Sequence, residues 1–305
     1  EIYTLSLHDA LPIFYYLVPG KLRNLLLFLG SLIFYAWGEP VYVILMLFSS
    51  IFNYYMGTEL ERLYYDDRKQ KINLIFSIII NLAVLVFFKY YGFLLNTIGG
   101  IIGIHIPHPE LSLPIGLSFY TFRNLSYLFD IYLSKVSAQR NFLTFAVYST
   151  MFPYTSAGPI VRYTDIETQL KQRTINISKF GTGAELFVKG LAKKVLLADN
   201  LSVLYSSICG HPQMSVFTSW LGILAYTMQL YFDFSGYSDM AIGLGKMLGF
   251  DFNKNFDYPY ISTSVSEFWR RWHISLGSWF RDYIYIPLGG NRVSTLKHIR
   301  NILVV

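Results

Sequence analysis

The sequence predicts an all-α, polytopic integral membrane protein, and three observations carry that prediction. Hydrophobic residues make up 53% of the 305 residues and charged residues only 14%, whereas soluble domains carry about 25% charged residues. Aromatic residues reach 18%, which suits the interface between a bilayer and water. The apolar residues also gather in segments of roughly the 20 residues that an α-helix needs to cross a bilayer.

The first third of the chain contains three predicted spans, bounded by a turn and a polar loop. The turn Gly38–Glu39–Pro40 separates the first two, because glycine and proline interrupt helices. The loop Glu59 to Lys71 precedes the third. The spans run from Leu22 to Trp37, from Val41 to about Gly57 and from Ile72 to about Leu95. Residues 1–13 fit nothing that follows and are interpreted as an artefactual lead-in, so a single domain over residues 14–305 is expected.

The rest of the chain continues in helical segments, several of which are interrupted. Leu111 to Leu133 contains Pro114, and Asn141 to Ile160 contains Pro153. Such breaks suit irregular backbone beside a cavity. The later segments are an amphipathic interfacial helix from Arg162 to Lys179, a helix from Gly181 to Ile208, and membrane segments from Val216 to Phe232 and from Phe234 to Phe250. About seven or eight spanning or re-entrant segments are expected in total.

Basic residues predict the orientation of these segments. The stretch Arg62 to Lys71 falls on the same side as Lys135 and Arg140, and the positive-inside rule makes that side cytoplasmic. The loop Gly99 to Pro109 has no Lys or Arg and is expected outside. The single cysteine, Cys209, excludes an internal disulfide and any multi-cysteine metal site. No metal ligand set and no bound cofactor are expected.

Polar side chains gather in the apolar stretch Tyr231 to Asp239. Asp233 and Asp239 are six residues apart and do not share one helical face, whereas Ser235 and Asp239 do, at i,i+4. Polar groups inside a membrane are costly and need a reason. Two interpretations stay open: a hydrogen-bond network that locks helices together, and groups that take part in chemistry.

A second polar set surrounds His273. As one helix, this stretch would place Trp269, His273 and Gly277 on one face. An imidazole can act as a general base, because its unperturbed pKa of about 6.5 allows both forms near neutral pH. Three arginines could hold a phosphate-bearing acyl donor: Arg270, Arg271 and Arg281. The alternative is a helix that lies on the membrane, with Trp anchors and with Arg on lipid phosphates.

The two polar sets belong to long motifs. These are YFDFSGYSDMAIG at Tyr231 to Gly243, and NFDYPYIS and EFWRRWHISLGSWFRDYIYIPLGGNR within Asn255 to Arg292. Shorter ones are FYAWGEP at Phe34 to Pro40, LPIGLSFYTFRNLSYLFD at Leu113 to Asp130 and AGPIVRY at Ala157 to Tyr163. In these motifs the chain resembles the membrane-bound O-acyltransferase family, in its alginate O-acetylase branch. One departure is Arg123–Asn124, where members usually carry Gln and a small residue, and its effect stays open.

The resemblance implies a helical bundle with re-entrant and interfacial helices around a tunnel, in a multi-pass protein of the bacterial plasma membrane. It implies transfer of an acyl group, usually acetyl, from acetyl-CoA or an acyl-carrier thioester in the cytoplasm. The implied acceptor is an extracytoplasmic polysaccharide such as alginate, reached directly or through a partner protein. It also implies that His273 is catalytic and is supported along the tunnel by Asp233, Ser235, Asp239, Asn255, Glu267, Arg270, Arg271, Arg281 and Asp282.

The resemblance further implies parts that this chain lacks. Members carry a second histidine in a later apolar segment and one more membrane helix at the start. The chain is therefore expected to be cut at both ends and catalytically inactive by itself. Membrane lipid is an expected partner, whereas nucleic acid is not, because the basic residues lie between apolar segments. The rival expectation is a transporter, a flippase or a non-catalytic export subunit, since broken helices and intramembrane carboxylates fit these too.

Overall fold

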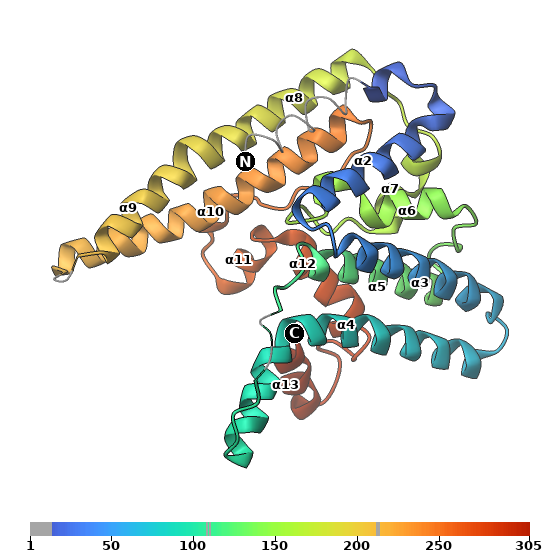
Figure 1. Cartoon of the computed structure of the whole chain (residues 1–305), viewed down its shortest axis with the longest axis horizontal. Coiled ribbons are helices and arrows are strands. Elements are labelled where there is room, and N and C mark those ends of the chain that lie inside the picture. Colours follow the sequence, from blue (N-terminus) through green and yellow to red (C-terminus); the bar gives the residue numbers. More distant parts are fainter. Residues whose placement is uncertain (1–13, 108, 110, 212–213) are drawn as a thin grey trace. The chain divides into compact units, whose positions relative to one another are not determined.

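Every secondary-structure element among the residues that the structure describes is a helix, which confirms the all-α prediction (Figure 1). The structure is a computed structural model and describes residues 14–107, 109, 111–211 and 214–305. The expected lead-in, residues 1–13, lies outside the described residues. The helices form two compact units, one within residues 1–156 and 162–171 and the other of residues 157–161 and 172–305. The expectation of a single domain stays a prediction.

The helices of the first unit begin and end at residues that satisfy the free backbone groups. Asp66 accepts a hydrogen bond from the Lys69 N–H at the start of α4, and Gly103 ends that helix with a left-handed φ of 70°. Asn141 caps α6 in the same way. The elements are η1 (Gly20–Leu22), α2 (Arg23–Gly38), α3 (Val43–Arg62), α4 (Asp67–Ile102), α5 (Leu117–Tyr132), α6 (Phe142–Thr150), η2 (Phe152–Tyr154) and α7 (Tyr163–Lys171).

Two helices of the described residues, α3 with 20 residues and α4 with 36, are long and apolar enough to cross a bilayer. They correspond to the second and third predicted spans. The predicted polar loop Glu59 to Lys71 is largely helical, because α3 continues to Arg62 and α4 begins at Asp67. The other predicted spans are shorter, interrupted or more polar, so the expected number of membrane segments stays a prediction.

A buried chain of hydrogen bonds joins α3 to α4, α5 and α6. Asn53 and Asn81 exchange amide hydrogen bonds of 3.0 and 2.8 Å. Asn124 donates to Ser49 at 3.1 Å and accepts from Ser149 at 3.0 Å. Between helices that face lipid, such bonds replace the hydrophobic effect as a cause of association. The departure at Asn124 therefore adds a link between α3 and α6.

Arg123, the other half of that departure, is fully buried in the same unit, with 1% of its surface exposed. Its guanidinium lies 4.3 Å from the ring centroid of Tyr154, an arrangement that a cation–π interaction stabilises. The backbone carbonyl of Arg123 accepts a hydrogen bond of 2.9 Å from the Tyr148 hydroxyl. The charge is thus held within an aromatic cluster of helix α5 and its neighbours.

The second unit is built around α10, a single helix of 32 residues. The sequence predicted two membrane segments there, broken at Asp233, and that prediction is wrong because lysines of a neighbouring helix neutralise the carboxylates. The predicted helix from Arg162 to Lys179 is also divided, between α7 and α8. The elements are α8 (Ile177–Ala192), the π-helix η3 (Lys193–Ala198), α9 (Asp199–Cys209), α10 (Val216–Met247), η4 (Pro259–Ile261), α11 (Val265–Arg271), α12 (Ile274–Phe280), the π-helix η5 (Arg281–Tyr285) and α13 (Thr295–Val304).

Helices α8 and α10 lie side by side and touch through their backbones at two pairs of glycines (Figure 1). A methyl group on Gly190 would lie 2.5 Å from the carbonyl oxygen of Gly236, and one on Gly183 would lie 2.7 Å from that of Gly243. The glycines of each helix are two turns apart and face the partner on one side. Small residues at a helix interface allow this close approach.

Replacing Gly190 by alanine is expected to destabilise the protein by about 1–3 kcal/mol, because the added methyl group forces two backbones apart. The matched control is Gly181→Ala in the same helix, where a methyl group meets nothing within 4 Å. That change is expected to be stabilising by about 0.5–1 kcal/mol. Thermal unfolding of the two variants in detergent measures the difference. Equal stabilities would show that the glycine contact does not hold the helices together.

Candidate active site

His273 lies at a sharp break between two short helices, α11 and α12. Its backbone is left-handed, with φ 44° and ψ 54°, which is uncommon for a residue other than glycine. The predicted continuous helix that would align Trp269, His273 and Gly277 on one face is therefore wrong. A residue keeps such a conformation only where its surroundings hold it there, and this is common at functional sites.

The backbone of an earlier segment clamps the His273 turn. The Asp257 N–H donates to the Arg271 carbonyl at 2.9 Å, and the Ile274 N–H donates to the Asn255 carbonyl at 2.9 Å. The two bonds flank Trp272 and His273, so both ends of the turn are bonded to the segment from Asn255 to Asp257. This contact between distant residues explains why a helix-like sequence breaks at His273.

The Asn255 side chain completes the clamp from a buried position. Its Oδ1 accepts hydrogen bonds from the Ser275 N–H at 3.2 Å and the Ser275 hydroxyl at 2.9 Å. Its Nδ2 donates to the Ser238 hydroxyl of α10 at 3.0 Å. The Ser275 hydroxyl also accepts from the Ile160 N–H at 3.0 Å. Asn255 thus ties α10, α12 and the stretch around Ile160 to the turn that carries His273.

A cluster of aromatic rings lies on one side of the imidazole. The Phe234 ring meets it edge-on, with centroids 4.8 Å apart. Phe256 packs against both Phe234 and Trp272 at 5.0 Å. His273 lies outside the candidate spans, between helices too short to cross a bilayer. Burial lowers the pKa of His273 to about 4, so the imidazole is neutral near pH 7 and is a weaker base than a solvent-exposed histidine.

The two aspartates of α10 face the π-helix η3. Asp233 forms an ion pair of 2.6 Å with Lys194, and Asp239 forms one of 2.6 Å with Lys193. Ser235, between them, is fully buried. These contacts agree with the interpretation of the stretch as a network that locks helices together. The motif still serves the site, because Phe234 and Ser238 of the same stretch contact His273 and Asn255.

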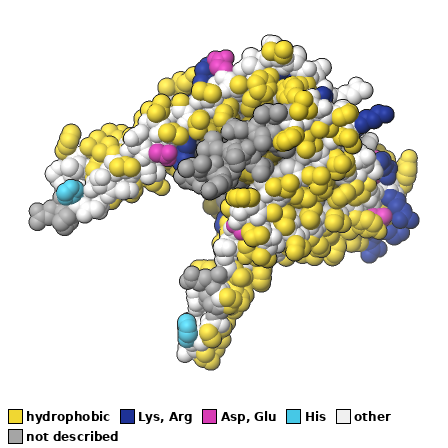
Figure 2. All heavy atoms as spheres, turned by 45° about the horizontal axis from the view of Figure 1, so that its top comes forward, with side chains coloured by type: hydrophobic (Ala, Val, Ile, Leu, Met, Phe, Trp, Pro, Cys, Tyr) yellow, Lys and Arg dark blue, Asp and Glu magenta, His cyan; other side chains and the backbone are white. Residues whose placement is uncertain are grey.

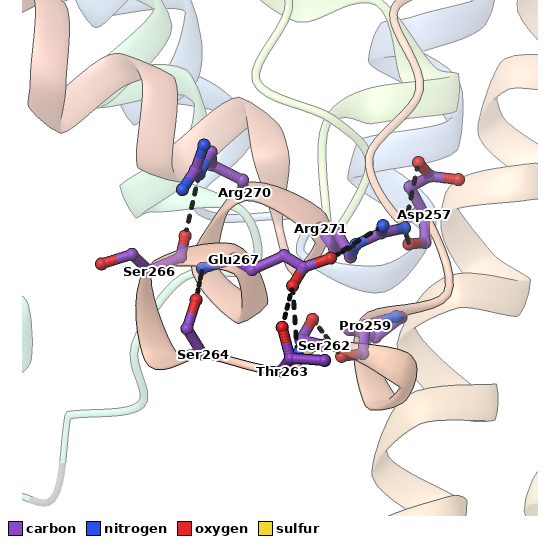
Figure 3. Close-up of polar contacts among 9 residues, drawn as sticks. All are labelled: Asp257, Pro259, Ser262, Thr263, Ser264, Ser266, Glu267, Arg270 and Arg271. Atoms are coloured by element: carbon purple, nitrogen blue, oxygen red, sulfur yellow. Dashed lines mark hydrogen bonds and ion pairs between the residues drawn. The ribbon is translucent and has the colours of Figure 1, made fainter.

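Glu267 and Arg271 support the turn from α11 (Figure 3). The Glu267 carboxylate accepts from the Thr263 N–H at 3.0 Å and pairs with Arg271 at 2.9 Å, and these bonds hold the pKa of Glu267 below its usual value. Arg271 also donates to the Asp257 carbonyl at 3.1 Å. Arg271 is therefore engaged with protein groups immediately before His273.

The three arginines expected to hold a phosphate differ in their surroundings. Arg271 pairs with Glu267, and Arg281 pairs with Asp282 at 2.7 Å. Arg270 is exposed, and its Nε donates to the Ser266 carbonyl at 3.1 Å. Within the described part of the chain, Arg270 is the member of this set with no carboxylate in ion-pair contact. Of these three arginines, Arg270 is the one whose guanidinium can bind an anion from solvent without leaving a carboxylate partner.

Sequence reasoning missed several residues of the site. Ser238 and Ser275 were not singled out, although they bond to Asn255, and Lys193 and Lys194 were read only as part of a helix. Two adjacent lysines in an apolar helix were a usable signal, because each needs a counter-charge inside a membrane. His298, in α13, has its Nε2 atom 3.1 Å from the Tyr285 hydroxyl.

Comparison with known proteins agrees with these motifs. The model of MBOAT, the membrane-bound O-acyltransferase family, matches residues 37–305. The chain is 44% identical to a probable alginate O-acetylase of Pseudomonas aeruginosa, over 96% of this chain and 58% of that protein. It is 34% identical to a peptidoglycan O-acetyltransferase of Helicobacter pylori, over 95% and 61%. A teichoic acid D-alanyltransferase of Bacillus subtilis is 28% identical, over 60% and 47%. The chain thus spans less than two thirds of the length of these relatives.

Proposed function

Because the chain belongs to the membrane-bound O-acyltransferase family, we propose that it is part of an enzyme that moves an acetyl group to a polysaccharide outside the cytoplasm. The names of the relatives support an O-acetyltransferase, since two of those described act as O-acetylating enzymes by name. The acceptor is a cell-surface glycan such as alginate, reached directly or through a partner protein. The protein resides in the bacterial plasma membrane as a multi-pass protein.

The observation that carries this proposal is the neutral imidazole of His273 on its clamped turn. In the proposed reaction, His273 accepts the proton of an acceptor hydroxyl while that oxygen attacks the acyl carbonyl carbon of a thioester. A carbon–oxygen bond forms, the carbon–sulfur bond breaks, and the thiolate leaves with the proton that the imidazole held. The aromatic rings of Phe234, Phe256 and Trp272 limit access of water to the reacting groups.

The proposed donor is acetyl-CoA or an acyl-carrier thioester, and both carry phosphate groups. Arg270 is proposed as the contact for such a phosphate, because Arg271 and Arg281 are already paired with carboxylates. Asn255, Glu267 and Arg271 are proposed to position the turn. Asp233 and Asp239 are proposed to fix α10 beside η3 through their ion pairs, with Ser235 buried between them. Asp282 is proposed to orient Arg281.

Labelling of acyl groups on cell-surface polysaccharide, with and without the full-length gene, tests the proposal. An acyltransferase predicts ester groups on the polysaccharide that disappear when the gene is deleted. A transporter or flippase predicts movement of intact solute and no change in ester. A non-catalytic subunit predicts loss of ester on deletion that the His273→Ala variant restores in full. Either of the last two results would refute the enzyme assignment.

The orientation of the protein gives a second test. We expect the Arg62 to Lys71 stretch to be cytoplasmic and the Gly99 to Pro109 loop to be external, because the first is rich in basic residues and the second has none. In a Cys209→Ser background, which removes the exposed native thiol, single cysteines at Arg68 and His105 are labelled from outside intact cells. Strong labelling of Arg68→Cys with none of His105→Cys would reverse the orientation.

Residues 14–305 by themselves are expected to be inactive. The reason is that the chain spans only 58% of the length of the alginate O-acetylase relative, and that His298 sits in a basic stretch and contacts Tyr285, which does not suit the second histidine that the family resemblance implies. Catalytic groups that act as a unit are strongly non-additive, so the loss of one costs nearly as much as the loss of all. Expression of this segment in a strain without its own O-acetylase, followed by measurement of polysaccharide acetyl, checks the expectation. Restored acetylation would show that one histidine of the pair suffices.

A further inference from the structure

A cavity of about 440 Å³ opens at one end of the first unit. It lies between the connection from α3 to α4 and the loop from α5 to α6. Polar groups that face it come from both sides: the side chains of Glu61, Tyr64 and Tyr65, and those of Ser134, Lys135 and Ser137. Ser134 has a left-handed backbone, with φ 55°, so the loop turns sharply beside the cavity.

The cavity lies beside the ends of the two candidate spans among the described residues. Helices α3 and α4 are the candidate spans among the described residues, and α3 ends at Arg62 where α4 begins at Asp67. The cavity lies beside both of these ends, so it faces the level of the lipid headgroups. Tyr65 is 96% exposed and Tyr64 is 50% exposed, and tyrosines are enriched at that level.

Basic side chains are the more exposed partners of the ion pairs at this end, although the carboxylate residue Asp67 is exposed there as well. In each of four ion pairs the cation is the more exposed partner. Lys135 is 43% exposed while its partner Asp130 is 1% exposed, and Arg140 is 73% exposed against 27% for Glu61. Figure 2 shows Lys and Arg side chains gathered at this end, on the right. Beside the cavity, the carboxylates of Asp130 and Glu61 are therefore less accessible than the ammonium of Lys135 and the guanidinium of Arg140.

We propose that this cavity binds the phosphate of an anionic phospholipid headgroup. The Lys135 ammonium, which also pairs with Asp130, and the hydroxyls of Ser134 and Ser137 supply donors for phosphate oxygens. The Glu61 carboxylate also lines the cavity, and its charge is paired with Arg140. The Tyr64 and Tyr65 rings, edge to face at 5.2 Å, supply an apolar wall for the glycerol region. Since the cavity opens beside two spans, the acyl chains of a bound lipid extend along helices whose outer faces are apolar.

Ser137 offers a test that leaves the ion pairs intact. Ser137→Glu places a negative charge in the cavity, and Ser137→Gln is the matched neutral control of nearly the same size. Native mass spectrometry of the detergent-solubilised chain, titrated with phosphatidylglycerol, measures lipid retention. We expect the parent chain and Ser137→Gln to bind alike, and Ser137→Glu to bind roughly tenfold more weakly, because like charges repel at the phosphate. Phosphatidylcholine and inorganic phosphate form the comparison arms.

Two results would overturn the proposal. Equal binding of phosphatidylglycerol by Ser137→Glu and Ser137→Gln would show that lipid phosphate does not enter the cavity. Displacement of phosphatidylglycerol by millimolar inorganic phosphate would assign the site to a free anion. Weak binding of phosphatidylcholine beside strong, Ser137-dependent binding of phosphatidylglycerol supports it. The outcome is separate from the acyl-transfer reaction, since the cavity belongs to the first unit and His273 to the second.

Discussion

Replacing His273 in the full-length protein is expected to lower the rate of acyl transfer by roughly 10²–10⁴-fold, the usual contribution of a general acid–base group. The preferred change is His273→Asn, because asparagine tolerates the left-handed backbone that the turn requires. Polysaccharide acetyl is measured at equal expression, with thermal unfolding in detergent as the check on folding. His273→Ala is expected to lose the same activity and slightly more stability. Unchanged acetylation in His273→Asn would remove the imidazole from the reaction.

The pH profile provides an independent check on the same residue. With the pKa of His273 lowered to about 4, the imidazole stays neutral as the pH falls from about 8 to about 5, and the base is lost only when the pH passes through about 4. The rate of acyl transfer by the solubilised full-length enzyme is therefore expected to be level across that range. A rate that falls by half near pH 6.5 would show that His273 has the ordinary pKa of a solvent-exposed imidazole, and would contradict the prediction.

Replacing Asn255 by alanine is expected to destabilise the protein by about 2–4 kcal/mol, because it leaves buried groups of Ser238 and Ser275 without their partner. Activity is expected to fall as well, since the clamp on the His273 turn loses its side-chain bonds. The thermal unfolding midpoint and the acetylation rate are measured together. A loss of activity at a temperature at which the variant remains folded would show that Asn255 positions the His273 turn.

Two companion variants separate the bonds of Asn255. Ser238→Ala removes only the contact to α10 and is expected to cost about 1 kcal/mol. Asn255→Asp keeps an acceptor for Ser275 and loses the donor to Ser238, so it is expected to retain more activity than Asn255→Ala. If Asn255→Ala unfolds at the same temperature as the parent protein, the clamp does not contribute to stability.

Hydropathy predicted the helical class and the spans within α3 and α4, because long apolar runs decide both properties locally. It failed at Asp233, which was read as a break, since the lysines that neutralise the aspartates lie some 40 residues earlier in the chain, in η3. A helix interior accepts a carboxylate when a cation on the neighbouring helix meets it. The continuity of α10 therefore depends on a contact with another helix, which local hydropathy does not reveal.

In the candidate site, too, local sequence patterns identified the residues, whereas contacts between distant residues decided the conformation. The motif around His273 could be found from its residue types, and Asn255 was named with it. The conformation of the turn could not, because apolar residues recur at helical spacing through Phe268, Trp272 and Leu276. The break depends on two backbone hydrogen bonds, one from the Ile274 N–H to the Asn255 carbonyl and one from the Asp257 N–H to the Arg271 carbonyl, which join residues far apart in the sequence. A periodic pattern reports the faces that a helix would bury and carries no information on such a clamp.

The length of α4 has a consequence for the bilayer around it. Its 36 residues extend about 54 Å, against a hydrocarbon core of about 30 Å. Figure 1 shows α4 bending toward its C-terminal end, so its first and last turns do not share one tilt. Lys89, whose ammonium lies 5.6 Å from the Tyr90 ring centroid, falls about 33 Å along the helix from Asp67. The turns beyond it, ending in the exposed Ile101 and Ile102, are apolar, so a thicker membrane can immerse them. We therefore expect α4 to accommodate hydrophobic mismatch through the depth to which its last turns are immersed.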